Sequence, residues 1–345
     1  MSAITAPEPS RAGMPKPRIG RRLIGVALIS AAIVSLVLAV PGLRGVASNI
    51  EHLQPGWVIA AVAFELGSCL GFVVIFRRFF DEVPGGPARE LAWVEQGAGA
   101  LLPGGGVGAL AIGGLFLHRE GLSIRKIIER SSALFFLTSA VNVLVLVGAG
   151  TLLVLGVTSG PGDLVRAGLP LAGGIAVAAV VLAAPILLRR SRSGRRPVWL
   201  ADLAAGVDGA CRSLLRPNWR MIGALAYLGL DIAALGATFA ATGHPLPVAP
   251  LVLAYLIGYL ANLIPVPGGF GVLEGGLAGA LIAYGAPATQ ATAAVIVYHA
   301  IAFWIPSLGG VIGYALLRDT QRNTDAAPVT PSPAARPACM AANPA

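Results

Sequence analysis

Long apolar runs separated by short polar connectors dominate the chain. Six of these runs are each about long enough to cross a bilayer as one helix, because about 20 helical residues span about 30 Å of hydrocarbon. The predicted spans are Leu23–Val40, Trp57–Phe76, Ser132–Val157, Leu169–Leu188, Met221–Thr242 and Ala291–Leu317. The pattern therefore predicts an all-α polytopic membrane protein.

Two further apolar runs are interrupted, Leu91–Leu117 at residues 102–108 and Val248–Tyr284 at residues 262–276. Proline removes a backbone donor and glycine permits positive φ, so neither run can be one continuous helix. The pieces are about 11 to 17 residues long, short of the roughly 20 that a span requires. We therefore expect two re-entrant hairpins. A break at membrane depth survives only inside protein or beside a wet cavity, which makes each break a candidate site.

The layout divides into two halves, at about 23–158 and 168–319, and each half reads span, span, hairpin, span. Three crossings in each half would invert the second half relative to the first. The two hairpin tips also match weakly, as Pro-Gly-Gly-Gly from Pro103 and Pro-Gly-Gly-Phe from Pro267. Inverted repeats with broken helices at corresponding positions are typical of transporters whose site lies near the bilayer midplane.

Composition supports a membrane protein, since 56% of the 345 residues are hydrophobic, 12% are charged and the mean hydropathy is +0.77. The net charge of +9 is concentrated in connectors at 11–22, 77–78, 118–130, 189–196 and 318–322. If both hairpins re-enter, all of these clusters lie on one side, and the opposite loops hold only Arg44 and Arg166. The positive-inside rule then places both termini in the cytoplasm and the protein in the cell membrane. We expect no nucleic-acid partner.

The remaining segments are assigned from their composition. They are a cytoplasmic basic segment at 1–22, a transmembrane domain at 23–319, an amphipathic interfacial helix at 198–216 and a disordered cytoplasmic tail at 320–345. The run from Leu23 is expected to be retained as a span, because Pro41 follows where a signal peptide would have small residues for cleavage.

The backbone of the two tips is the first candidate binding site. A helix that leaves such a tip presents unpaired N–H groups and the positive end of its dipole, which bind anions such as a phospholipid head group. The alternative is that the glycines serve only close packing of helices. The candidate head-group residues are Pro103, Gly104, Gly105, Gly106, Asn262, Pro265, Pro267, Gly268, Gly269, Glu274 and His299.

Acidic residues within the apolar runs are the second set of candidates, because a carboxylate at membrane depth is costly unless it is paired or wet. Glu274 follows the second break, so it either faces the cavity or caps the next helix. Glu65 and Asp231 lie at similar depth in the two halves, as a functional polar pair or as glue between helices. Glu95 is an isolated candidate.

His299 in the last span is either a proton-coupling or head-group ligand, or a histidine that is simply hydrogen-bonded in place. No nucleotide-binding loop, zinc motif or nucleophile elbow occurs in the sequence. We therefore expect no enzyme, no cofactor and no metal.

The second break and the last span also carry a family resemblance. Residues 263–274, Leu-Ile-Pro-Val-Pro-Gly-Gly-Phe-Gly-Val-Leu-Glu, are similar to the P-x-P-G-G-x-G-x-x-E signature of the lysylphosphatidylglycerol synthase transmembrane-region family. Tyr298-His and Pro306-x-x-Gly309 follow in order, and Leu102-Pro103 with Gly121-Leu-Ser resembles a first, weaker motif. The resemblance covers about residues 20–320, and the family usually has Arg at the position of His299.

This resemblance implies an integral membrane protein that handles lipids, including aminoacylated phosphatidylglycerol and isoprenoid-linked sugars. The soluble aminoacyl-transferase domain of the bifunctional members is not recognised, so synthesis of lysylphosphatidylglycerol is not expected. The sequence favours a flippase-like transporter that moves an anionic lipid between leaflets through a cavity between the hairpins. The alternative is a non-catalytic membrane subunit that assists a separate glycosyl- or aminoacyl-transferase partner. The oligomeric state is not predicted.

Overall fold

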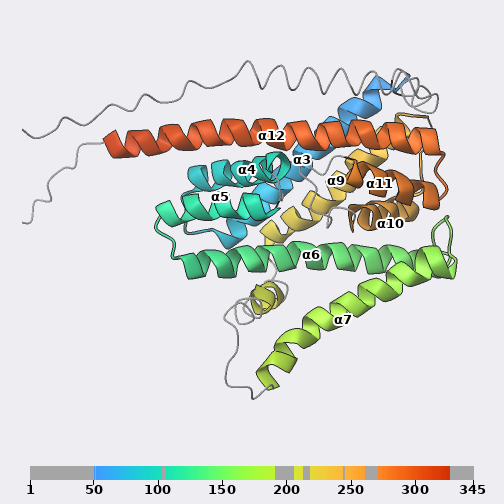
Figure 1. Cartoon of the computed structure of the whole chain (residues 1–345), viewed down its shortest axis with the longest axis horizontal. Coiled ribbons are helices and arrows are strands. Elements are labelled where there is room, and N and C mark those ends of the chain that lie inside the picture. Colours follow the sequence, from blue (N-terminus) through green and yellow to red (C-terminus); the bar gives the residue numbers. More distant parts are fainter. Residues whose placement is uncertain are drawn as a thin grey trace, which may run out of the picture.

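The computed structural model describes residues 50, 52–102, 106–190, 206–212, 218–243, 245–260 and 271–326, and within them the chain is helical with no strand (Figure 1). This confirms the predicted all-α class. The named helices are α3 (Pro55–Phe79), α4 (Gly85–Leu101), α5 (Gly106–Arg119), α6 (Ile124–Val154), the π-helix η1 (Leu164–Gly168), α7 (Leu169–Arg190), the 3-10 helix η2 (Trp219–Met221), α9 (Ile222–Ala240), α10 (Val248–Gly258), α11 (Val272–Ala283) and α12 (Ala288–Ala326).

Five stretches of the described chain are long and apolar enough to cross a membrane. They are Pro55–Phe79, Ile124–Val154, Leu164–Ala183, Trp219–Ala240 and Ala288–Asp319. They correspond to five of the six predicted spans, and the protein is therefore a polytopic membrane protein. The first predicted span, Leu23–Val40, lies outside the described residues.

Two helices extend beyond the predicted limits. α6 begins at Ile124 rather than at Ser132, because the hydroxyl of Ser123 caps it by accepting from the Lys126 N–H at 3.4 Å. At the other end of the chain, α12 continues to Ala326 although the tail was predicted to begin at residue 320. In both cases a polar turn continues an apolar helix, so the change from apolar to polar residues does not mark the end of the helix.

Of the predicted interfacial helix at 198–216, residues 206–212 are described and are helical. Val207 and Ala210 are buried, and a Cβ on Gly206 would lie 2.7 Å from Cβ of Ser132, so this piece packs against α6. Its position at the membrane interface stays a prediction.

Both interrupted runs fold back on themselves. α4 and α5 have 17 and 14 residues and pack against each other, and α10 and α11 have 11 and 12 residues and do the same. None of the four reaches the length of a span. Gly258 marks the closest approach in the second pair, where an added Cβ would lie 2.7 Å from Cα of Leu277.

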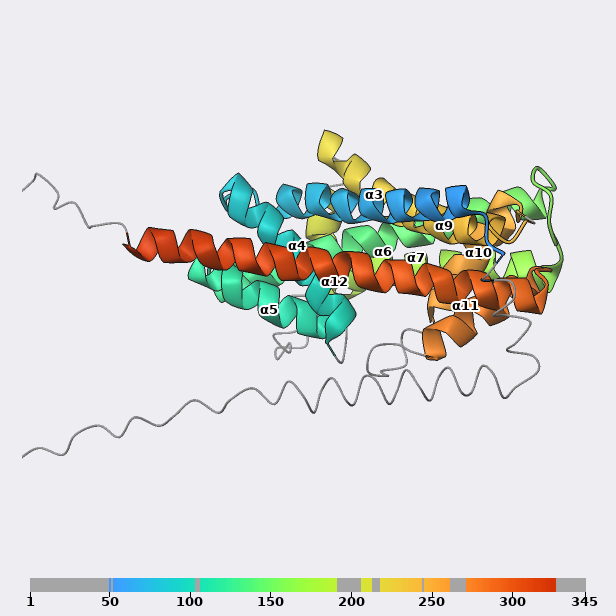
Figure 2. The ribbon, with the colours of Figure 1, turned by 90° about the horizontal axis from the view of Figure 1, so that it is seen from above.

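The two hairpins enter the bundle from opposite ends. α6 and α12 run antiparallel along its length, with α4 and α5 toward one end and α10 and α11 toward the other (Figures 1 and 2). The helix order long, short, short, long is the same in α3–α6 and in α9–α12. This is the arrangement expected of an inverted pair, although the first span of the first half is not among the described residues.

α3 and α9 pack antiparallel along their length, and theirs is the most extensive pairing among the described helices. Glycine on both helices lets the backbones meet, since a Cβ on Gly71 would lie 2.7 Å from the Tyr227 nitrogen and one on Gly223 would lie 2.6 Å from the Gly71 oxygen. The hydroxyl of Ser68 adds a hydrogen bond to the Tyr227 carbonyl at 2.8 Å. This is the close packing that small residues give to membrane helices.

α12 rests on α4 through a second glycine contact. A Cβ on Gly97 would lie 2.7 Å from Cα of Gly310, and Gly313 lies against the backbone of Glu90. Pro306 lies within α12 just before this contact. Because proline has no N–H, the carbonyl of Ala302 lacks its usual helical partner, and the helix has a weak point there.

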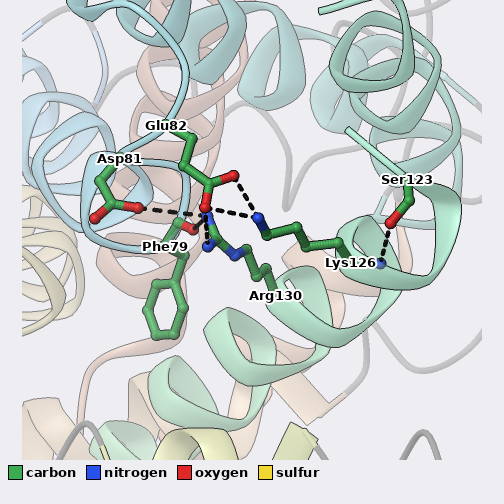
Figure 3. A network of polar contacts seen from close by, with 6 residues as sticks. All are labelled: Phe79, Asp81, Glu82, Ser123, Lys126 and Arg130. Atoms are coloured by element: carbon green, nitrogen blue, oxygen red, sulfur yellow. Dashed lines mark hydrogen bonds and ion pairs between the residues drawn. The ribbon is translucent and has the colours of Figure 1, made fainter. Parts of the chain in front are cut away.

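One end of the bundle is closed by basic side chains, and we call it the basic end: the end of α3, the start of α6 and the start of α9. Arg130 donates to the Phe79 carbonyl at 2.8 Å and pairs with Glu82 at 3.0 Å, and Lys126 pairs with Glu82 at 2.6 Å (Figure 3). Arg220 of η2 donates to the Arg77 carbonyl at 2.9 Å. These contacts satisfy carbonyls at the end of α3 that have no helical partner.

Candidate functional site

Most of the predicted tip residues lie outside the described part of the chain. Gly106 is the first residue of α5, and of the intramembrane candidates the structure places Glu65, Glu95, Asp231, Glu274 and His299. The residues that lie outside the described part are Pro103, Gly104, Gly105, Asn262, Pro265, Pro267, Gly268 and Gly269. The head-group role of the tips therefore stays a prediction.

Glu65 of α3 and Asp231 of α9 meet at the central crossing. The two carboxyl groups are close enough to interact directly, and Glu65 is 5% exposed. Their meeting follows from the glycine contact two turns away, which holds the two helix backbones together. The structure therefore brings the two residues together, and whether they act as a functional pair or only hold the helices together stays a prediction.

Two tyrosines complete this cluster. Tyr255 of α10 donates its hydroxyl hydrogen to Oδ2 of Asp231 at 2.5 Å, and Tyr298 of α12 donates to Oδ1 at 2.6 Å. Both rings are buried and stand edge to face, with centroids 6.4 Å apart. Since a carboxylate accepts and does not donate, both oxygens of Asp231 have a donor. We call Glu65, Asp231, Tyr255 and Tyr298 the acid cluster.

Both hairpins touch this centre. α10 contributes Tyr255 directly, and α4 contributes Gln96, whose amide donates to the carbonyl of Cys69 at 3.3 Å. The thiol of Cys69, one turn after Glu65, lies 3.8 Å from Oε1 of that carboxyl. α10 thus contacts the acid cluster directly, and α4 contacts the neighbouring turn of α3 through a partly buried hydrogen bond.

A second polar pair lies at the start of α11, directly after the glycine-rich break. Nδ1 of His299 lies 2.6 Å from Oε1 of Glu274, and the other carboxyl oxygen accepts from the backbone N–H of Gly271 at 2.5 Å. Gly271 has φ +85°, a conformation that favours glycine, and it ends the break and begins the helix. Glu274 thus caps the helix, as one of its two predicted roles required, and also contacts His299; its exposure to a cavity stays a prediction.

The acid cluster and this pair are joined through α12. Tyr298 contacts Asp231 and the next residue, His299, contacts Glu274. A rotation or shift of α12 at this level would therefore alter both contacts together.

Glu95 lies apart from both groups. Its carboxylate packs on α5, where a Cβ at Gly113 would lie 2.9 Å from Oε2. The structure therefore does not bring Glu95 into contact with Glu65 or Asp231.

An apolar groove of about 380 Å³ lies on the surface between α3 and α12. Its lining includes Val62, Ile296 and Trp304 and contains no polar side chain. Hydrocarbon fits such a lining, whereas a head group does not.

Sequence reasoning missed Tyr255 and Gln96. Tyr255 stands in the apolar helix Val248–Gly258, where an aromatic residue is usually part of the core. A usable signal was the hydroxyl itself, because a tyrosine buried in hydrocarbon needs an acceptor and Asp231 was already a candidate acid within an apolar run.

Comparison with known proteins agrees with this architecture. The model of the family described as lysylphosphatidylglycerol synthase TM region matches residues 22–310. A protein described as a UPF0104 membrane protein from Methanothermobacter thermautotrophicus is 35% identical over 109 residues, which are 30% of this chain and 31% of that protein. The match thus spans about a third of the relative's length. Since the family model covers most of the chain, the protein belongs to the lysylphosphatidylglycerol synthase transmembrane-region family.

Proposed function

We propose that the protein moves a lipid with an anionic or aminoacylated head group, or an isoprenoid-linked lipid, between the leaflets of the cell membrane without covalent chemistry. The observation that carries this proposal is the meeting of two hairpins, from opposite ends, at one buried polar centre. Such a centre gives a head group polar contacts halfway across the hydrocarbon, where it otherwise has none.

The chemistry at the start of α11 supports a charged head group. His299, when protonated, supplies a positive charge beside a helix N-terminus, and Glu274 supplies a negative charge beside it. A phosphate is complementary to the first and an ammonium group to the second. The acyl chains would remain in hydrocarbon, for which the groove along α3 and α12 is suited.

The direction of insertion follows from the positive-inside rule. The basic end carries Arg77, Lys126, Arg130 and Arg220. The opposite end lies where α6 ends and α10 begins, and it carries Arg166 beside Asp163. We therefore place the basic end in the cytoplasm. At that surface, basic residues attract anionic lipid with about 1 kcal/mol for each charge.

Reconstitution tests the function. Purified protein in vesicles of phosphatidylethanolamine and phosphatidylglycerol is expected to bring fluorescent phosphatidylglycerol from the inner to the outer leaflet, where dithionite bleaches it. Glu274→Gln weakens a charge-assisted contact worth about 1.5–3 kcal/mol. If the contact is needed in the slow step, the rate falls by about 10- to 100-fold.

Glu129→Gln is the matched control, because Glu129 is an exposed acid on α6 near the basic end. This variant is expected to keep the wild-type rate. Wild-type vesicles that bleach no faster than protein-free vesicles, with all tested head groups, would refute the transport proposal.

A further inference from the structure

Two carboxyl groups lie side by side at the α3–α9 crossing, and no cationic side chain of the described residues pairs with them. The ion pairs of the described residues join Lys126, Arg130, Arg166 and His299 to other acids, and none reaches Glu65 or Asp231. Two adjacent negative charges at this depth would repel each other without the screening that water gives at a surface.

A count of donors shows what is missing. Each oxygen of Asp231 accepts from one tyrosine hydroxyl, so Asp231 is well supplied with donors as a carboxylate and can accept a further hydrogen bond. Oε2 of Glu65 is inaccessible to solvent and has no hydrogen-bond partner. Between two carboxylates no hydrogen bond can form, because neither donates.

One added proton removes both the repulsion between the two charges and the missing hydrogen bond of Glu65. A protonated Glu65 donates to Asp231, gives its own oxygen a partner and reduces the charge of the pair from two to one. The remaining charge then rests on Asp231, which has the two tyrosine donors. Two carboxyls sharing one proton is the arrangement that close acid pairs adopt elsewhere in proteins.

The other titratable groups that face the pair do not supply a positive charge that would balance it. They are the thiol of Cys69 on α3, the phenol of Tyr227 on α9, that of Tyr255 on α10, that of Tyr259 directly after α10, and that of Tyr298 on α12. All of these are neutral or negative when they titrate. His299 is next to Tyr298 but contacts Glu274.

A metal ion fits this position poorly. The hydrogens of both tyrosine hydroxyls point at Asp231, and this orientation repels a cation. Among the described residues, no three His, Cys, Asp or Glu side chains are grouped to hold a metal. A proton needs neither a cavity nor further ligands.

We propose that Glu65 and Asp231 form a proton-binding site that holds one proton between their carboxyls and lets proton binding drive the lipid movement. The driving role rests on the function proposed above, whereas the site itself does not. The site can act on the second hairpin and on α12, because the hydrogen bonds from Tyr255 of α10 and Tyr298 of α12 depend on the charge of Asp231. His299, the residue after Tyr298, contacts Glu274 at the start of α11.

Infrared difference spectroscopy tests the site without any transport. Protein in detergent is titrated with acid and base, and the stretching band of protonated carboxyls is recorded. Glu65→Gln is the informative variant, because its amide also donates to Asp231 and imitates the protonated state, so the variant is expected to fold. The wild type should show a band that titrates and that Glu65→Gln lacks, and the control Glu129→Gln should retain it.

Three results would overturn the site: the same titrating carboxyl bands in the wild type and in Glu65→Gln, the absence of any such band in the wild type, or a band that disappears when sodium replaces potassium. The last result would identify a sodium site instead. In vesicles with an imposed pH gradient, the wild type is expected to move labelled lipid several-fold faster than without the gradient. The rate of Glu65→Gln is expected to be the same with and without the gradient. A wild-type rate that ignores the gradient refutes the coupling, whereas a lack of any lipid movement refutes the proposed function and leaves the infrared result to decide on the site.

Discussion

Removal of one tyrosine hydroxyl from the acid cluster tests how Asp231 is held in the bundle. Tyr298 is 1% exposed, and its hydroxyl lies 2.6 Å from Oδ1 of Asp231. Tyr298→Phe keeps the ring and its packing and removes only the donor. A hydrogen bond to a charged group is worth about 1.5–3 kcal/mol, and a neutral one about 0.5–1.5 kcal/mol. We therefore expect Tyr298→Phe to lower the free energy of unfolding by about 2 kcal/mol.

A double-mutant cycle isolates the charge. In an Asp231→Asn background the acceptor is neutral, so Tyr298→Phe should cost only about 1 kcal/mol and the coupling between the two changes should be about 1 kcal/mol. Unfolding by sodium dodecyl sulfate in mixed micelles, followed by circular dichroism, measures all four proteins. Tyr314→Phe is the control, because Tyr314 on the same helix is 47% exposed. An equal cost of Tyr298→Phe with Asp231 and with Asn at that position would refute a charged acceptor.

Three further predictions concern the frame of the bundle. Gly223→Ala places a Cβ 2.6 Å from backbone oxygen and should destabilise by about 1–3 kcal/mol, whereas Gly229→Ala on the same helix meets nothing within 4 Å and should be neutral or stabilising; equal thermal stabilities in detergent would contradict the close contact. In a cysteine-free background, Ala288→Cys and Glu120→Cys should react with an impermeant maleimide from opposite sides of oriented vesicles, and labelling from one side would contradict the inverted hairpins. The hydrogen bond from a lysine lowers the pKa of Glu82 below 4.5, so its stabilisation is full above pH 4.5 and is lost as the pH falls through the lowered value; Glu82→Gln should flatten this acid-side loss in a thermal titration, and an unchanged profile would assign it to another group.

The hairpins could be predicted from sequence because their cause is local. Pro265, Pro267 and the adjacent glycines act on their own backbone, and the short lengths of the flanking helices follow directly. The start of α6 could not be predicted in this way. Lys126 and Arg130 look like a connector in sequence, and they are helical because the cap at Ser123 and the ion pairs to Glu82 stabilise that turn.

The candidate site was predictable only in part. Glu65 and Asp231 are conspicuous as acids in apolar runs, but their contact depends on which faces of α3 and α9 meet, and this is decided by Gly71 and Gly223 about two turns away. Tyr255 became part of the site because α10 folds back against α9, a tertiary contact without a local signal. For His299 the sequence offered several roles, and the structure gives its partner, Glu274.

The proline within α12 has a mechanical consequence. Before Pro306, α12 carries Tyr298, which contacts Asp231, and His299, which contacts Glu274 of the second hairpin. After Pro306, Gly310 packs against the first hairpin. A joint between these two stretches lets one tilt while the other stays seated, at the small cost of a bend where a backbone bond is already missing. In the proposed transport, this joint would let the part of α12 that contacts the second hairpin move while the part on the first hairpin keeps its packing.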